Sequence, residues 1–138
     1  MYERILIALD GSEHSRRALE DAKELATLAK SQVRVLHVRE EYFIGRAGLV
    51  PTEAHQAATK LVDDAVAALS EVGIAATGTV RASLAGRVAA EILEEAESWG
   101  ASLIVMGSRG FTDLAGLLLG STAHKVLHLG KNPVLIVR

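Results

Sequence analysis

The chain has 138 residues, a formal net charge of −2 and no cysteine. This length suits one domain with its own core, which we assign to residues 1–138, and the lack of cysteine excludes disulfides and thiolate chemistry. Acidic and basic residues are interleaved and no apolar run reaches transmembrane length, so we expect no nucleic-acid and no membrane partner. The chain opens without a signal-peptide pattern, so we expect a cytoplasmic protein.

Strand and helix patterns alternate along the chain. Short apolar or β-branched runs predict five strands, and apolar residues at helical spacing predict four helices. The expected strands cover residues 4–9, 33–38, 74–81, 103–106 and 133–138. The expected helices cover residues 12–30, about 52–73, about 85–99 and about 120–129.

Three details of these elements bear on the fold. Ser12 is a suitable N-cap for the first helix. The pattern dissolves over residues 39–50, where glycines interrupt the chain, and we interpret this segment as a mobile connection. The strand at 74–81 is less apolar than the others, which is typical of a sheet edge.

Five strands alternating with four helices predict a parallel sheet with right-handed crossovers. The fold class is therefore α/β, a Rossmann-like, three-layer, doubly wound domain with a five-stranded parallel sheet. Ligands in such sheets bind at the carboxyl ends of the strands, where the strand order reverses. If the order is 3-2-1-4-5, Asp10 after the first strand and Gly107 after the fourth flank that point.

A glycine-rich loop follows the fourth expected strand. Gly107 and Gly110 are separated by two residues, and after nine more Gly120 precedes Ser121 and Thr122 at the start of a helix. Glycines let the backbone approach a ligand, and the N–H groups of a helix start favour anions. The pattern predicts a phosphate cradle; the alternative is a loop whose glycines only make turns and whose Ser121 is only an N-cap.

The loop matches neither of two common phosphate motifs. No Walker A string occurs, because the one Gly-Lys pair is followed by Asn132. The first strand ends in Asp10-Gly11-Ser12 instead of the glycine fingerprint of dinucleotide-binding folds.

No set of residues predicts a catalytic centre. His124 and His128 have a spacing that can chelate zinc, but a third ligand is missing from the pattern, so we predict no metal site. No Gly-x-Ser-x-Gly elbow occurs, and His37 within a strand is more typical of a packed or hydrogen-bonded core residue. We assign no catalytic residue, and any turnover should be slow.

The chain resembles the universal stress protein family over essentially its whole length. The spacing from Gly107 to Ser121 is similar to the ATP-binding signature of that family. The segments that carry the resemblance are 5–12, 35–38, 104–110, 118–122 and 132–137. The resemblance implies a fold of the adenine nucleotide alpha hydrolase type that binds ATP, alone or with Mg²⁺.

The resemblance also implies which residues meet the nucleotide. Ala8 and Val38 would frame the base, Asp10 would lie near the adenosine, and the glycine loop would hold ribose and phosphates. With Met106 and Arg109 added, the candidate residues are Ala8, Asp10, Val38, Met106, Gly107, Arg109, Gly110, Gly120, Ser121 and Thr122.

Four of these residues have a simpler alternative. Asp10 accepts hydrogen bonds when ionised, which suits ribose hydroxyls or the adenine amine, but it is also a good turn residue. Val38 and Met106 are equally compatible with plain core positions. Arg109 could pair with a phosphate oxygen or be a solvated loop residue.

The last strand adds a prediction about assembly. An apolar edge at Val134–Val137 invites pairing with another copy, and the resemblance implies a homodimer there. We therefore expect a cytoplasmic, dimeric, ATP-binding stress-response module that acts on an unidentified protein partner. The alternatives are a slow Mg²⁺-dependent ATP hydrolase or nucleotidyl transferase, and a nucleotide-free dimeric interaction protein.

Overall fold

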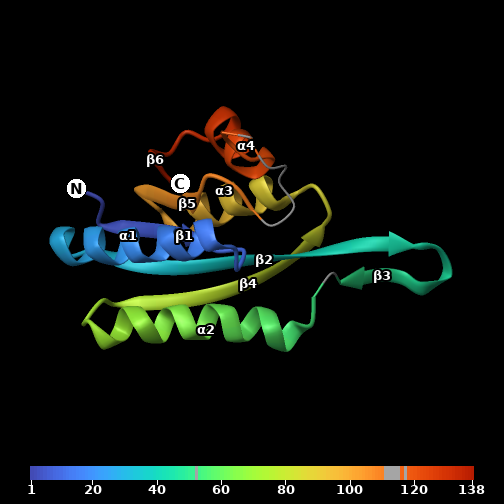
Figure 1. Cartoon of the computed structure of the whole chain (residues 1–138), viewed down its shortest axis with the longest axis horizontal. Coiled ribbons are helices and arrows are strands. Elements are labelled where there is room, and N and C mark those ends of the chain that lie inside the picture. The colour runs from blue at the N-terminus through green and yellow to red at the C-terminus, as the bar shows by residue number, and fades with distance from the viewer. Residues whose placement is uncertain (52, 111–115, 117) are drawn as a thin grey trace.

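The computed structural model describes residues 1–51, 53–110, 116 and 118–138. Its strands are β1 (Arg4–Ala8), β2 (Gln32–Ile44), β3 (Gly48–Pro51), β4 (Ala76–Leu84), β5 (Leu103–Gly107) and β6 (Val134–Val137). Its helices are α1 (Glu13–Ala29), α2 (His55–Glu71), α3 (Val88–Trp99) and α4 (Ser121–Leu129), with a short 3₁₀ helix η1 (Gly45–Ala47). Figure 1 shows their arrangement.

Five strands form a parallel sheet in the order β4-β2-β1-β5-β6. This is the predicted 3-2-1-4-5 order, and it brings the ends of β1 and β5 side by side in the middle of the sheet. The less apolar strand β4 lies at one edge, as its composition predicted, and β6 lies at the other.

The prediction that residues 39–50 form a mobile connection is wrong. β2 continues to Ile44, the chain turns through η1, and β3 returns antiparallel along β2 with Tyr42 opposite Val50. The sheet is therefore mixed and six-stranded, not purely parallel and five-stranded. Figure 1 shows that this hairpin arm, residues 42–51, extends beyond the rest of the molecule.

The physical reason for the hairpin arm lies in its residue types. Gly45 and Gly48 have positive φ angles of 38° and 72°, which other residues rarely adopt, so they permit the reversal. The strands beside them contain aromatic and β-branched residues such as Tyr42, Phe43 and Ile44, which favour extended backbone. The glycines that interrupted the sequence pattern thus make the turn of a hairpin.

The core has two halves, one on each face of the sheet. Side chains alternate along β1, so Ile5 and Ile7 pack toward α1 and α2, while Leu6 packs toward α3 and α4. All three are fully buried. The result is the expected three-layer arrangement, with a helix layer on each side of the sheet.

The start of α1 follows the predicted cap. Ser12 is the N-cap, and its hydroxyl oxygen accepts the Ser15 N–H at 3.2 Å. No helix in the described part of the chain is long and apolar enough to cross a lipid bilayer.

Candidate functional site

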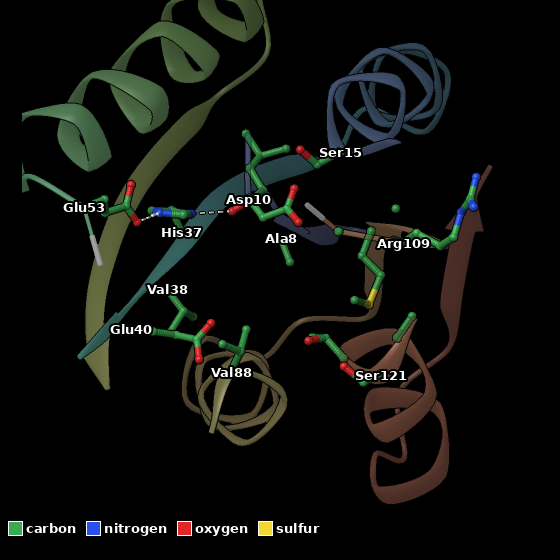
Figure 2. Close-up of a pocket in the computed structure, with 16 residues that line it drawn as sticks. Ala8, Asp10, Ser15, His37, Val38, Glu40, Glu53, Val88, Arg109 and Ser121 are labelled. Carbon is green, nitrogen blue, oxygen red and sulfur yellow. Dashed lines mark hydrogen bonds and ion pairs between the residues drawn. The ribbon is translucent and has the colours of Figure 1, made fainter. Parts of the chain in front are cut away.

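A cavity of about 480 Å³ opens at the carboxyl ends of β1 and β5, beside the middle of β2. Residues from the starts of α1, α3 and α4 complete its wall (Figure 2). Nine of the ten candidate residues line it, which are Ala8, Asp10, Val38, Met106, Gly107, Arg109, Gly110, Ser121 and Thr122. Gly120 is not among the lining residues and has a different position, described below.

Asp10 combines a turn role with a place on the cavity wall. Its Oδ1 accepts the Ser12 N–H at 2.9 Å, which fixes the turn between β1 and α1. The residue is exposed and lines the cavity. A carboxylate has about four lone-pair sites, so the turn leaves it able to accept further hydrogen bonds from a bound molecule.

Val38 presents both its side chain and its backbone to this region. The side chain belongs to the core on the α3 face and also lines the cavity. The Leu36 carbonyl oxygen faces β1, since it accepts the Leu9 N–H at 2.8 Å. Backbone direction alternates along a strand, so the N–H and C=O of Val38 point to the same side, just beyond the end of β1 at Ala8.

The far end of the cavity is built where β5 meets α4. Ser108 is buried; its N–H donates to the Val137 carbonyl at 2.7 Å, and its own carbonyl accepts the Gly120 N–H at 2.6 Å. These bonds tie the start of α4 to the end of β5. Gly120 is the N-cap and Ser121 is the first helical residue, so the N-cap role considered for Ser121 is wrong.

Most of the loop between these two points, residues 111–115 and 117, lies outside the described residues. The described ends still place Gly107, Gly110, Ser121 and Thr122 on one cavity wall. The first-turn N–H groups of a helix have no partner within that helix. This end of the cavity therefore favours an anionic group.

Gly107 is required by packing. A Cβ at this position would lie 2.8 Å from the Cβ of His14, 2.9 Å from its carbonyl carbon and 3.0 Å from the Ser15 nitrogen. Two of these atoms are backbone and cannot easily move. The glycine lets β5 end against the first turn of α1, which brings the two loops together.

Arg109 also lines the cavity, and Figure 2 shows its side chain directed away from Ser121. Its Nη2 lies 3.2 Å from Nε2 of His14, and the residue is half-buried. It is the one lysine or arginine among the described lining residues. The arginine is thus partly held by α1, in contrast to the solvated loop residue considered as the alternative.

His37 and Glu53 form a pair at the opposite end. His37 is buried, as its strand position predicted, and its Nδ1 lies 2.6 Å from the Leu9 carbonyl oxygen. Its Nε2 is in close contact with a carboxylate oxygen of Glu53. Figure 2 shows this pair beside Asp10.

Sequence reasoning did not identify Glu53 or the other added lining residues. Glu53 precedes α2 in a segment without a motif. Glu40, whose carboxylate accepts the Gly86 N–H at 3.1 Å, lies beyond Val38, where the sequence predicted the end of the strand. One signal was available: a histidine within an apolar strand needs polar partners. The further lining residues are Leu9, Ser15, Val88 and Ala123.

The two histidines of α4 do not join a larger cluster of potential ligands. The rings of His124 and His128 stack with centroids 6.0 Å apart. Within the described ranges, no group of three or more His, Cys, Asp or Glu side chains is arranged to hold a metal ion.

Comparison with known proteins gives consistent matches. The model of the universal stress protein family matches residues 1–138. The universal stress protein YxiE of Bacillus subtilis is 36% identical over 151 aligned residues, which cover both chains completely.

Solved structures agree with the fold. The structure of protein MJ0577, from Methanocaldococcus jannaschii, aligns with a TM-score of 0.80 and 28% identity, covering 99% of this chain and 96% of the other. A universal stress protein from Archaeoglobus fulgidus, solved in complex with dAMP, aligns with a TM-score of 0.70 and 22% identity, covering 99% and 98%. The second match shows the fold, and the nucleotide belongs to that protein.

Proposed function

Since this chain belongs to the universal stress protein family, we propose that it is a cytoplasmic regulatory module that binds ATP or a related adenine nucleotide in the cavity at the ends of β1 and β5, beside the middle of β2. One observation carries the proposal. Two loops far apart in the sequence converge on one cavity and give it opposite chemistries, a carboxylate from Asp10 in one part and amide donors near Ser121 in another.

The shape and chemistry of the walls suit an adenosine group. Ala8, Val38, Val88 and Met106 supply apolar surface for a planar base. The backbone of Val38 faces the open side of β2 and can pair with the edge of the base. Asp10 can accept hydrogen bonds from ribose hydroxyls or from the base amine, and it would repel phosphates.

The phosphates would lie at the start of α4, beside Arg109. A helix terminus contributes about 0.3–1 kcal/mol per exposed charge, whereas micromolar affinity needs about 8 kcal/mol. The adenosine contacts must therefore supply most of the binding free energy. ATP would bind alone or with Mg²⁺ on its phosphate oxygens, which is the common way for this ion to bind.

The nucleotide proposal is supported by a related structure and is open to a direct test. The Archaeoglobus fulgidus protein binds dAMP within the same fold. Small molecules released from the purified protein should include an adenine nucleotide. Added ATP should raise the unfolding temperature, because a ligand that binds only the folded state stabilises it. A protein that carries no nucleotide and gains no thermal stability from ATP, ADP or AMP would contradict the proposal.

Assembly is the second part of the proposal. β6 pairs with β5 on one side, and Leu135 on this outer strand is 37% exposed. We propose that two copies pair through Val134–Val137, and that occupancy of the cavity changes the surface offered to a protein partner. Leu135→Lys should convert the dimer to a monomer in sedimentation experiments. A wild-type monomer at high micromolar concentration would refute this pairing.

A further inference from the structure

His37 and Glu53 connect the start of α2 with the end of β1. Nδ1 of the His37 ring lies 2.6 Å from the Leu9 carbonyl oxygen, and its Nε2 is in close contact with a carboxylate oxygen of Glu53. Figure 2 shows Glu53 directed toward His37. All three residues line the cavity, so this connection is part of the cavity wall.

The start of α2 has few other groups to hold it. Glu53 and Ala54 are the described residues between β3 and α2. Ala54 is the N-cap and makes no side-chain hydrogen bond, and the first turn of the helix contains no acidic residue. A helix start without these groups is less stable. In the described part of this linker, Glu53 therefore provides the side-chain contact that fixes the helix start to the sheet.

The contact between His37 and Glu53 requires a proton. The Leu9 carbonyl oxygen can only accept, so the hydrogen on Nδ1 of His37 points to it. The Leu9 N–H in turn donates to the Leu36 carbonyl oxygen at 2.8 Å, which fixes the position of Leu9. A neutral ring with its hydrogen on Nδ1 has a lone pair on Nε2, and this lone pair would repel the carboxylate. One further proton must therefore lie between Nε2 and Glu53.

We infer that His37 and Glu53 form a proton-dependent latch, which holds the start of α2 against the cavity and releases it as the pH rises. In water a histidine loses its proton at about pH 6.5 and a glutamic acid at about pH 4.3. Between these values the open and the closed latch bind the same number of protons, so pH has no effect. Above about pH 6.5, closing takes up one proton, and the ratio of closed to open forms should fall about tenfold per pH unit. The inference holds whichever molecule the cavity binds.

Other charged groups near the latch can be separated from it. In water, carboxyl groups titrate at about pH 4 and guanidinium groups above about pH 12, outside the range of the experiment. His55 is exposed and is the first residue of α2, so it could titrate within that range. It is therefore replaced by glutamine in every protein compared below. The charged or titratable residues on the surrounding elements are Asp10, His14, Arg39, Glu40, Glu41, His55 and Arg109.

The test follows the start of α2 by NMR from pH 6 to about pH 9. The reporters are the backbone amides of Ala57 and Ala58, which donate to the Ala54 carbonyl oxygen at 3.1 and 3.2 Å. In the parent protein, His55→Gln, their signals should stay constant up to about pH 6.5. They should then move toward the positions found in Glu53→Ala, which cannot form the latch, because the ratio of closed to open forms falls about three-hundredfold by pH 9.

Glu53→Gln distinguishes the latch from a merely structural contact. Its amide can donate to the lone pair on Nε2 of His37 without an added proton, so the signals should keep their closed positions throughout. Glu71→Gln makes the same charge change at the exposed end of α2 and should behave as the parent does. Three results would each overturn the inference: parent signals that stay fixed to pH 9, Glu53→Gln signals that move with pH as the parent's do, or Glu53→Ala signals that match the parent's at pH 6.

Discussion

The two ends of the cavity are built in different ways. At the α4 end, backbone groups of one glycine-rich loop and the helix that follows it form the wall, with one arginine beside them. At the other end, the polar part of the wall includes side chains from three separate segments, Asp10, Glu40 and Glu53. The position of a wall made of backbone groups is set by the local spacing of glycines. The position of a wall made of side chains is set by the packing of segments that are distant in the sequence.

Gly107→Ala should have the largest effect, because it disturbs the position of both ends. The added Cβ would press on the backbone of His14 and Ser15, and overpacking of this kind costs about 1–3 kcal/mol of stability. It would also push the end of β5 away from α1, so the affinity for ATP should fall more than tenfold, a loss above about 1.4 kcal/mol. Chemical denaturation and calorimetry measure the two losses.

Gly78→Ala is the matched control for this prediction. A Cβ at Gly78 would meet the side chains of Val62 and Val66 on α2, away from the cavity. It should lower stability while affinity for ATP stays the same. Equal affinity of Gly107→Ala and the wild type would break the link between this close packing and the site.

Asp10→Asn tests the side-chain end alone. The amide keeps an oxygen that accepts the Ser12 N–H, so the turn and the stability should be nearly preserved. The loss of the charge should weaken ATP and adenosine alike, by about tenfold, since hydrogen bonds to charged groups contribute about 1.5–3 kcal/mol. Calorimetric titration of both ligands measures this.

An exposed acid on α1 provides the control for Asp10. Asp21→Asn changes the same charge at an exposed position of that helix and should bind both ligands as the wild type does. If Asp10→Asn weakens ATP but not adenosine, the carboxylate does not act on the adenosine part of the ligand.

Arg109→Gln tests the α4 end alone. It removes the charged donor beside the proposed phosphates, so ATP should bind about three to ten times more weakly, whereas adenosine should be unaffected. The difference should shrink at high salt, because salt screens partly exposed charges. Lys131→Gln, an exposed residue outside the cavity wall, is the control, and an equal loss for adenosine would contradict the assignment.

The contrast between the two ends also explains what could be predicted from the sequence. Alternation with helices predicts parallel strands with right-handed crossovers. The order 3-2-1-4-5, which was assumed at that stage and which the structure shows, placed Asp10 and Gly107 together. The α4 end was visible because glycine spacing and a helix start are local features. The nucleotide role of these residues remains a prediction.

The rest of the site could not be predicted, because it depends on contacts between segments that lie far apart in the sequence. Glu53 reaches the cavity because β2 extends past Val38 and the hairpin arm returns the chain beside His37. The packing role of Gly107 depends on α1, which lies far away in the sequence. The hairpin arm itself was missed because its glycines were interpreted as interruptions, although its Tyr42, Phe43 and Ile44 are strand-forming residues.

Ser12→Ala should have the smallest effect on binding. It distinguishes the stability of this region from its affinity for ATP. The hydroxyl caps α1 by accepting the Ser15 N–H, and loss of such a cap costs about 1 kcal/mol of stability. The Ser12 N–H that holds Asp10 is a backbone group and is kept. Denaturation should therefore reveal a less stable protein whose affinity for ATP changes less than twofold. A loss of affinity as large as that of Asp10→Asn would mean that the side-chain end depends on the rigidity of α1 more than on the carboxylate.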